Sequence, residues 1–448
     1  MYTNFLLEIF KENKQNTAII WNDKEYSYEW LLNSIAEWKN YLVNKGIESS
    51  KIVSVIGDFS PTSISLLLAL IENRNIIVPL THSADIDIKK RLMISGAAAL
   101  LKINKDDDVE YSVLDNKSDH QHYQELRKQQ LPGLVLFTSG TSGEPKAAVH
   151  DFSRLLNKFK LPRKSLRTIN FLLFDHWGGL NTLFHTLSCG GVVLSLHERS
   201  PEKVCAFIEK YKIELLPASP TFLNLLILSE SFKNYDLSSL KLITYGTEPM
   251  PESTLKRIKE IFHSVKLQQT YGLIELGVLR SKSKSDDSLW VKIGGEGYST
   301  RVVDGILQIK ADSAMLGYLN APSPFTDDGY FITGDAVNVD GDYLKILGRK
   351  SELINVGGEK VYPAEVENVI IQFQNVLDAT VFSEKNPITG NIVCAKIMLK
   401  SPADKKEFVK KLKKYCRERL QSYKVPVKII ITNEVQHTER FKKKRADV

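Results

Sequence analysis

Short apolar runs alternate with helical patterns along the chain after Thr168. The runs at 168–174, 191–196, 241–246 and 267–272 predict strands. Between them, two segments, 201–212 and 251–262, each begin with a proline, which suits the first turn of a helix. Strands and helices that alternate in this way predict a parallel sheet with helices on its faces, and ligands of such sheets lie beyond the carboxyl ends of the strands.

The pattern changes after Gly348 to that of a small α+β unit. Apolar residues at helical spacing predict helices around 366–373 and 408–419, and strands are expected at 377–383, 391–399 and 425–432. We therefore expect an α/β protein with a large N-terminal domain, 1–349, of parallel-rich sheets and flanking helices. A small α+β C-terminal domain, 350–448, follows it.

One buried strand, Leu134–Phe137, ends in a loop of small polar residues. Such a loop leaves its backbone N–H groups accessible and can wrap an anion such as phosphate, with hydroxyls and a lysine adding donors. Its spacing is not that of a Walker loop or a dinucleotide fingerprint, and an ordinary surface loop is the alternative. The candidate phosphate residues are Thr138, Ser139, Gly140, Thr141, Ser142, Gly143 and Lys146.

Composition indicates an ordinary globular protein, with 43% hydrophobic and 25% charged residues. The four cysteines form no C-x-x-C or Cys/His cluster, and the N-terminus lacks a signal-peptide pattern, so a cytoplasmic protein without a membrane span is expected. The net charge of +7 is uneven, because residues 400–448 hold 12 Lys and 4 Arg against 6 acidic residues. No nucleic-acid motif accompanies this basic region, and a phosphate-rich small ligand fits it better.

Further polar stretches follow predicted strands in a fixed order: "TYGTEPM" at 244–250, "QTYGLIELG" at 269–277, "FITGDAV" at 331–337 and "GRKSELINVGGEKVYPAEVE" at 348–367. Together with the loop at 138–146, they resemble the adenylate-forming superfamily of acyl-CoA synthetases, carrier-protein adenylation domains and firefly-type luciferases. The resemblance spans nearly the whole chain.

The resemblance implies a role for each motif. The loop 138–146 would hold the β and γ phosphates of ATP. Tyr271 and Gly272 would pack on adenine, with Gly246, Thr247 and Glu248 as the opposite wall. Glu275 would bind Mg²⁺, a hard cation that prefers carboxylate and phosphate oxygens. Asp335 would accept hydrogen bonds from the ribose hydroxyls, helped by Arg349.

The resemblance also implies that the small domain rotates between two half-reactions about a hinge at Ser351. The loop 356–360 would then face the second active site, where its glycines allow a pantetheine arm to pass. The tail "VQHTERFKKKR" is similar to a family motif whose catalytic lysine aligns with Lys442 and whose trailing arginine aligns with Arg445. The neighbouring Lys443 and Lys444 would be ordinary solvated lysines, and an alignment shifted by one residue is the alternative.

Three positions depart from the family pattern. Ile274 replaces a phosphate-contacting threonine, Ala147 replaces the glycine after the loop lysine, and Phe441 replaces the glycine of the tail. The main charged groups are kept, so we expect an active ligase that adenylates a carboxylic acid with ATP and passes the acyl group to coenzyme A. Transfer to a separate carrier protein and a degenerate nucleotide-binding paralogue are the alternatives.

The acid is expected to bind near "FDHWGGLNTLFHTLSCGG", residues 174–191. One alignment places His176 where the o-succinylbenzoate and aryl-CoA ligases carry a pocket histidine. Another places Asp175 where amino-acid-activating relatives pair with an α-amino group, but its spacing to the following glycine pair is too long. We therefore expect an aryl or acyl acid without an α-amino group, lined by His176, Trp177, Thr221, Tyr245 and Gly277.

Overall fold

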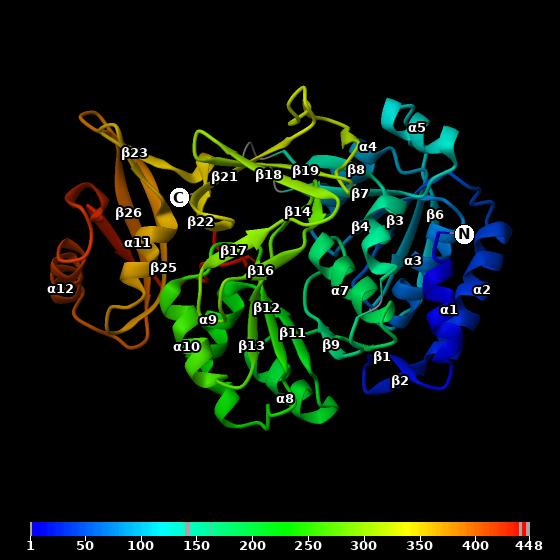
Figure 1. The fold of residues 1–448 in the computed structure, drawn as a ribbon, viewed down its shortest axis with the longest axis horizontal. Helices are drawn as coiled ribbons and strands as arrows, with labels where there is room; N and C mark the ends of the chain where they lie inside the picture. Colours follow the sequence, from blue (N-terminus) through cyan, green and yellow to red (C-terminus); the bar gives the residue numbers. More distant parts are fainter. Residues whose placement is uncertain (1, 139–143, 162, 439–440, 445–448) are drawn as a thin grey trace.

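The computed structural model describes residues 2–138, 144–161, 163–438 and 441–444. A large α/β body precedes a smaller α+β body, which lies at the left of the view in orange and red (Figure 1). The large body contains two seven-stranded sheets and one six-stranded sheet.

The first seven-stranded sheet has the strand order β13-β12-β11-β9-β10-β1-β2, and all its neighbours run parallel except the edge strand β2. It holds the four strands that the sequence predicts after Thr168. Its strands are β1 (Thr17–Trp21), β2 (Lys24–Ser27), β9 (Arg167–Asn170), β10 (Val192–Ser195), β11 (Leu215–Ala218), β12 (Leu242–Tyr245) and β13 (Lys266–Gln269).

The second seven-stranded sheet has the order β20-β8-β7-β4-β3-β5-β6, with a parallel centre and antiparallel pairs toward both edges. Strand β7 is the predicted strand that enters the phosphate loop. The strands are β3 (Ile52–Ile56), β4 (Ile76–Leu80), β5 (Ala99–Ile103), β6 (Val109–Val113), β7 (Gly133–Thr138), β8 (Lys146–Asp151) and β20 (Gly317–Tyr318).

The two sheets share a helical core, in which apolar side chains of both sheets pack against four helices. These are α1 (Asn4–Glu12), α2 (Tyr28–Asn44), α3 (Pro61–Glu72) and α7 (Trp177–Leu187). The other face of the first sheet is covered by α8 (Pro201–Tyr211), α9 (Pro220–Ser229) and α10 (Glu252–Ile261). The other face of the second sheet packs against α4 (Asp85–Ser95) and α5 (Gln121–Gln129), and the short α6 (Phe152–Leu156) joins the shared core.

An antiparallel sheet of order β16-β17-β22-β21-β19-β18 completes the large body. The sequence pattern does not predict this sheet. Its strands are β16 (Ser281–Ser283), β17 (Trp290–Ile293), β18 (Tyr298–Val303), β19 (Ile306–Ala311), β21 (Phe331–Asp340) and β22 (Tyr343–Arg349). A small hairpin of β14 (Gly272–Leu273) and β15 (Gly277–Val278) links it to the parallel sheet.

The small body contains a hairpin, a three-stranded sheet and two helices around their own core. Its strands are β23 (Ile354–Val356), β24 (Glu359–Val361), β25 (Val376–Asn386), β26 (Gly390–Leu399) and β27 (Lys428–Ile431), and its helices are α11 (Pro363–Ile370) and α12 (Lys405–Arg417). All helices and strands that the sequence predicts here are present. The division at 349/350 stays a prediction.

No helix in the described part of the chain is long and apolar enough to cross a membrane. All four cysteines are free thiols; Cys205, Cys394 and Cys416 are buried, and Cys189 is partly exposed.

Candidate active site

The ends of the predicted phosphate loop are held by the second seven-stranded sheet. Thr138 ends β7 and Lys146 opens β8, and the two residues are paired across the strands. Asn320 fixes the approach to Lys146 from both sides, because its Nδ2 donates to the Pro145 carbonyl and its Oδ1 accepts from the Ala147 N–H, each at 2.9 Å. The predicted residues Ser139, Gly140, Thr141, Ser142 and Gly143 lie outside the described residues.

Tyr318 links the loop lysine with the predicted magnesium ligand. The Lys146 ammonium lies 5.7 Å from the centre of the Tyr318 ring, and the Tyr318 hydroxyl donates to Glu275 Oε1 at 2.5 Å. Burial and the neighbouring Glu275 raise the pKa of the Tyr318 phenol, so the hydroxyl remains a donor. The sequence analysis missed Tyr318, which comes from the short strand β20.

The same carboxylate suits a metal ion shared with phosphates. Glu275 is partly exposed, and in the described part of the chain its Oε2 has no hydrogen-bond partner. No group of three or more His, Cys, Asp or Glu side chains that could hold a metal occurs among the described residues. A single carboxylate fits Mg²⁺, which commonly takes one or two carboxylates together with substrate phosphates and water.

The predicted ribose and adenine residues come from three elements: Tyr271 follows β13, Asp335 lies in β21 and Arg349 ends β22. The Tyr271 hydroxyl donates to Asp335 Oδ2 at 2.6 Å, and Arg349 Nε lies 3.7 Å from Asp335 Oδ1. Asp335 is 7% exposed, and burial raises the pKa of its carboxyl, while the Tyr271 hydrogen bond and Arg349 lower it. Gly272 opens the hairpin beside them, where a Cβ would lie 2.9 Å from the Gly277 carbonyl oxygen.

The segment 246–248 follows β12 and reaches the C-terminal tail at Lys443. A Cβ on Gly246 would lie 2.6 Å from the Thr270 carbonyl oxygen, so only glycine fits this close approach. Thr247 has a φ of 75°, a rare conformation for a β-branched residue. The Glu248 carboxylate accepts from the N–H of Thr221 at 2.8 Å and from the Thr221 hydroxyl at the start of α9. Its other oxygen accepts from the Lys443 N–H at 3.3 Å.

The C-terminal tail returns to the large body and brings Lys442 to this site. Lys442 and Phe441 line a small hollow together with His176, Arg199 and Thr247. The next residue, Lys443, turns to the small body, where its ammonium donates to the Asp378 carboxylate and, at 2.7 Å, to the Ala379 carbonyl. Of the three tail lysines, Lys442 is therefore the one placed with His176. Arg445 lies outside the described residues.

His176 stands at the N-terminus of α7 and caps it, because its Nδ1 accepts from the Gly178 N–H at 3.0 Å. In the neutral ring, the proton is then on Nε2. Two glycines let the helix start against the preceding chain: a Cβ on Gly179 would lie 2.4 Å from the Leu173 carbonyl oxygen. The hollow at Lys442 is thus bordered by a fixed imidazole.

Other predicted acid-pocket residues are spread over three places. Trp177 and Gly277 lie in contact, since a Cβ on Gly277 would meet Trp177 Nε1 at 2.8 Å. Thr221 joins Glu248, and Tyr245 is buried in the core beneath the first sheet. Asp175 is 3% exposed, accepts from the Thr81 hydroxyl at 3.1 Å and lies 3.6 Å from Arg91. A carboxylate held in this way is poorly placed to receive a substrate amine.

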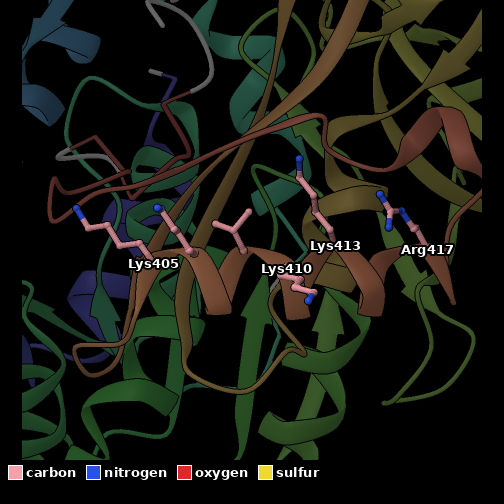
Figure 2. Close-up of a pocket in the computed structure, with 6 residues that line it drawn as sticks. Lys405, Lys410, Lys413 and Arg417 are labelled. Atoms are coloured by element: carbon pink, nitrogen blue, oxygen red, sulfur yellow. The ribbon is translucent and has the colours of Figure 1, made fainter.

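A broad, open hollow on α12 contains none of the motif residues. It is lined by Val409 and by basic side chains along one face of the helix, of which Lys405, Lys410, Lys413 and Arg417 are labelled in Figure 2. This face accounts for much of the positive charge that the sequence places in the C-terminal region. We do not assign it to the active site, since α12 lies on the outer side of the small body (Figure 1).

Comparison with known proteins defines the class. The chain matches the AMP-binding enzyme family over residues 8–305 and the C-terminal domain of AMP-binding enzymes over residues 365–442. The chain therefore belongs to the AMP-binding enzyme family, as its motifs predict, and it is an enzyme of the AMP-forming ligase class.

Individual relatives are acyl-CoA ligases. The 2-succinylbenzoate–CoA ligase of Bacillus licheniformis is 31% identical over 65% of this chain and 64% of its own length. That of Listeria monocytogenes serotype 4b is 24% identical over 99% of this chain and 98% of its own length. A solved anthranilate CoA ligase in complex with anthranoyl-AMP has a TM-score of 0.83 at 19% identity, covering 98% of this chain and 95% of that one. At this identity the last comparison supports the fold alone.

Proposed function

We propose that this enzyme activates an aryl or acyl carboxylic acid with ATP, releasing pyrophosphate, and then transfers the acyl group from the acyl adenylate to coenzyme A. The observation that carries the proposal is the position of Lys442. The tail places this lysine beside His176 and Thr247 on the large body, although most of the C-terminal region packs in the small body. Its relatives among the CoA ligases support the choice of acceptor.

Each group of residues in the site has its own chemical task in the proposed reaction. A carboxylate is a poor electrophile, and attack of its oxygen on the α-phosphorus of ATP supplies the AMP leaving group. Lys442 stabilises the negative charge that the carboxylate and the α-phosphate bring together. Asp335 and Arg349 hold the ribose, and Tyr271, with the backbone of 246–248, holds the base. The loop 138–146 with Lys146 receives the β and γ phosphates.

Glu275 would hold Mg²⁺ through its Oε2, since its Oε1 accepts from Tyr318. The ion supplies charge neutralisation to the phosphate oxygens. Tyr318 orients the carboxylate by its hydrogen bond and keeps Lys146 nearby through its ring. The Ile274 and Ala147 departures leave these contacts in place, which favours an active enzyme over a degenerate paralogue.

We further propose that the chain divides into domains at 1–349 and 350–448 and that the small domain rotates for the second half-reaction. Ser351 lies in a short 3₁₀ turn, 350–352, directly after β22. This position suits a hinge, because the turn is exposed and joins two bodies with separate cores. Rotation would bring the loop 356–360, which contains the β23–β24 turn, to the site in place of Lys442. A cytoplasmic location is part of the proposal, supported by the four free thiols.

The decisive experiment is acid-dependent exchange of labelled pyrophosphate into ATP, measured with benzoates, fatty acids and α-amino acids. Exchange with benzoates or fatty acids supports the proposal, and exchange with none of them contradicts it. The acceptor is then tested by offering free coenzyme A or a phosphopantetheinyl carrier protein to the same enzyme. Thioester formation only on the carrier would replace coenzyme A in the proposal.

A further inference from the structure

Phe441 stands where related tails carry a glycine, and its surroundings show what the ring does. It packs on two aromatic side chains of the large body, with ring centres 5.3 Å from Phe171 and 5.5 Å from Phe222. The ring of His437, from the same tail, also stacks on Phe441, with ring centres 5.5 Å apart and an angle of 20°. Phe441 thereby joins the apolar core between the first sheet and α9.

The backbone at Phe441 is also tied to the large body. Its carbonyl accepts from the Ser219 hydroxyl at 2.8 Å, and Ser219 is the residue that caps α9. Its own N–H donates to the Thr438 carbonyl at 2.9 Å, which closes a turn in the tail. The residue has a φ of 50°, in the left-handed region that favours glycine, so a phenylalanine is held there at a cost in backbone energy.

Both neighbours of Lys442 are therefore anchored. Phe441 is fixed on the large body by two aromatic contacts and one hydrogen bond. Lys443 donates its backbone N–H to Glu248 of the large body and its ammonium to Asp378 and the Ala379 carbonyl of the small body. The four-carbon stem of a lysine is flexible, so the side chain loses conformational entropy when its ammonium group is held in one position. Anchoring the backbone on both sides limits that loss to the side chain alone.

We propose that Phe441 is a positioning residue for adenylation, whose ring anchors the tail in the Phe171–Phe222 aromatic pair and so holds Lys442 beside His176. The proposal rests on the proposed function, in which Lys442 acts on the carboxylate and the α-phosphate. Because rotation of the small domain must remove this ring from its pair, the same contact favours the orientation in which the acid is adenylated.

Two variants at Phe441 separate the effect of its ring from the effect of its left-handed backbone. F441G relieves the left-handed backbone but removes the ring, whereas F441L keeps an apolar side chain of similar size. We expect F441G to lower the kcat of pyrophosphate exchange at least 10-fold, with the KM for ATP changed less than twofold, and F441L to recover most of the rate. Thioester formation from a supplied acyl adenylate is expected to persist in both variants.

The matched control is F232A, which removes a partly buried ring from the edge of the same apolar core without touching the tail. Limited trypsin digestion gives a readout independent of turnover, because F441G is expected to release the tail at Lys442–Lys444 faster than wild type, and F232A is not. The proposal is overturned if F441G matches wild type in either exchange or digestion, or if both half-reactions fall equally. If the wild-type enzyme exchanges pyrophosphate with none of the acids, the proposed function is contradicted instead. The rates of trypsin digestion of F441G and wild type then test whether the Phe441 ring anchors the tail.

Discussion

At the scale of single residues, the proposed chemistry depends on Lys442. We expect Lys442→Ala to lower acid-dependent pyrophosphate exchange about 100-fold or more, since removing one preorganised donor commonly costs that much. Thioester formation from a supplied acyl adenylate should stay within a few-fold of wild type, because the proposed rotation would remove the lysine from the site in that step. Lys444→Ala is the control, as this lysine is exposed and its backbone N–H, which the substitution keeps, donates to the Gln436 carbonyl. Equal loss of both half-reactions would remove the proposed role.

His176 caps α7, and in the proposed function it has a second, separable task, which is to face the acid. His176→Asn keeps a good cap for the helix, whereas His176→Ala loses it at a cost of about 1 kcal/mol in the free energy of unfolding. Both variants are expected to raise the KM for the acid much more than the KM for ATP, measured by exchange. If only His176→Ala raises the KM for the acid, in step with its lower free energy of unfolding, the histidine acts only as a cap.

The choice of acid has its own test. Faster exchange with α-amino acids than with benzoates or fatty acids, abolished by Asp175→Ala, would contradict an acid without an α-amino group.

In the proposed function, in which Asp335 binds the ribose, we expect ATP binding to depend on pH in a way that Tyr271 influences. Burial raises the pKa of Asp335, and the Tyr271 hydroxyl lowers it by stabilising the carboxylate. Tyr271→Phe should therefore raise the pKa of Asp335 further. Since the ribose hydroxyls need the ionised carboxylate as acceptor, the loss of ATP affinity on acidification is expected to begin at a higher pH in the variant. Profiles of the KM for ATP against pH that superimpose for the two proteins would contradict this assignment.

At the scale of elements, the hinge prediction concerns the 3₁₀ turn after β22. A proline at 351 fixes its own φ and disfavours the helical conformation of Lys350, so Ser351→Pro should stiffen the turn. We expect thioester formation to slow several-fold more than pyrophosphate exchange. Ser351→Ala keeps the backbone free and serves as the control. Unchanged rates of both steps in the proline variant would place the hinge elsewhere.

The sequence predicts most elements of the parallel sheet and of the small body, because buried strands and amphipathic helices leave strong apolar patterns. The strands predicted at 168–174 and 267–272 are too long, since β9 ends at Asn170 and β13 at Gln269. After β9, the chain from Phe171 leads to the cap of α7. The six-stranded antiparallel sheet escapes prediction because its strands are short or mixed in burial, as the pattern of β18 shows. The residues at which strands begin and end depend on tertiary contacts, which the local sequence pattern does not contain.

The motifs locate the site residues along the chain, but they do not give the partners that orient them. Tyr318 joins Lys146 to Glu275 from β20, a two-residue strand with no pattern of its own. Arg199 borders the Lys442 hollow because its guanidinium is held by Asp58 at 2.7 Å, a pairing 141 residues apart in sequence. Contacts over such separations are fixed by the fold.

At the scale of the whole molecule, the tail couples the two bodies through the ion pair of Lys443 and Asp378, whose side chains are each 10% exposed. Lys443→Ala leaves a nearly buried carboxylate unpaired, and we expect a loss of about 3 kcal/mol in the free energy of unfolding of the small body. The double variant Lys443→Met with Asp378→Asn should recover part of it, measured by urea denaturation of the full chain. A double variant no more stable than Lys443→Ala would show that the pair itself contributes little.

The arrangement of the thiols gives a practical means of watching this molecule move. Cys189 is the cysteine with partial exposure, and the other three are buried in the described structure. A maleimide dye should therefore react first at one native position on the large body. A second dye on a cysteine introduced at Lys410, on the outer face of α12, would form a donor–acceptor pair across the proposed hinge. Single-molecule energy transfer could then count the two orientations directly as acid, ATP and thiol are added in turn.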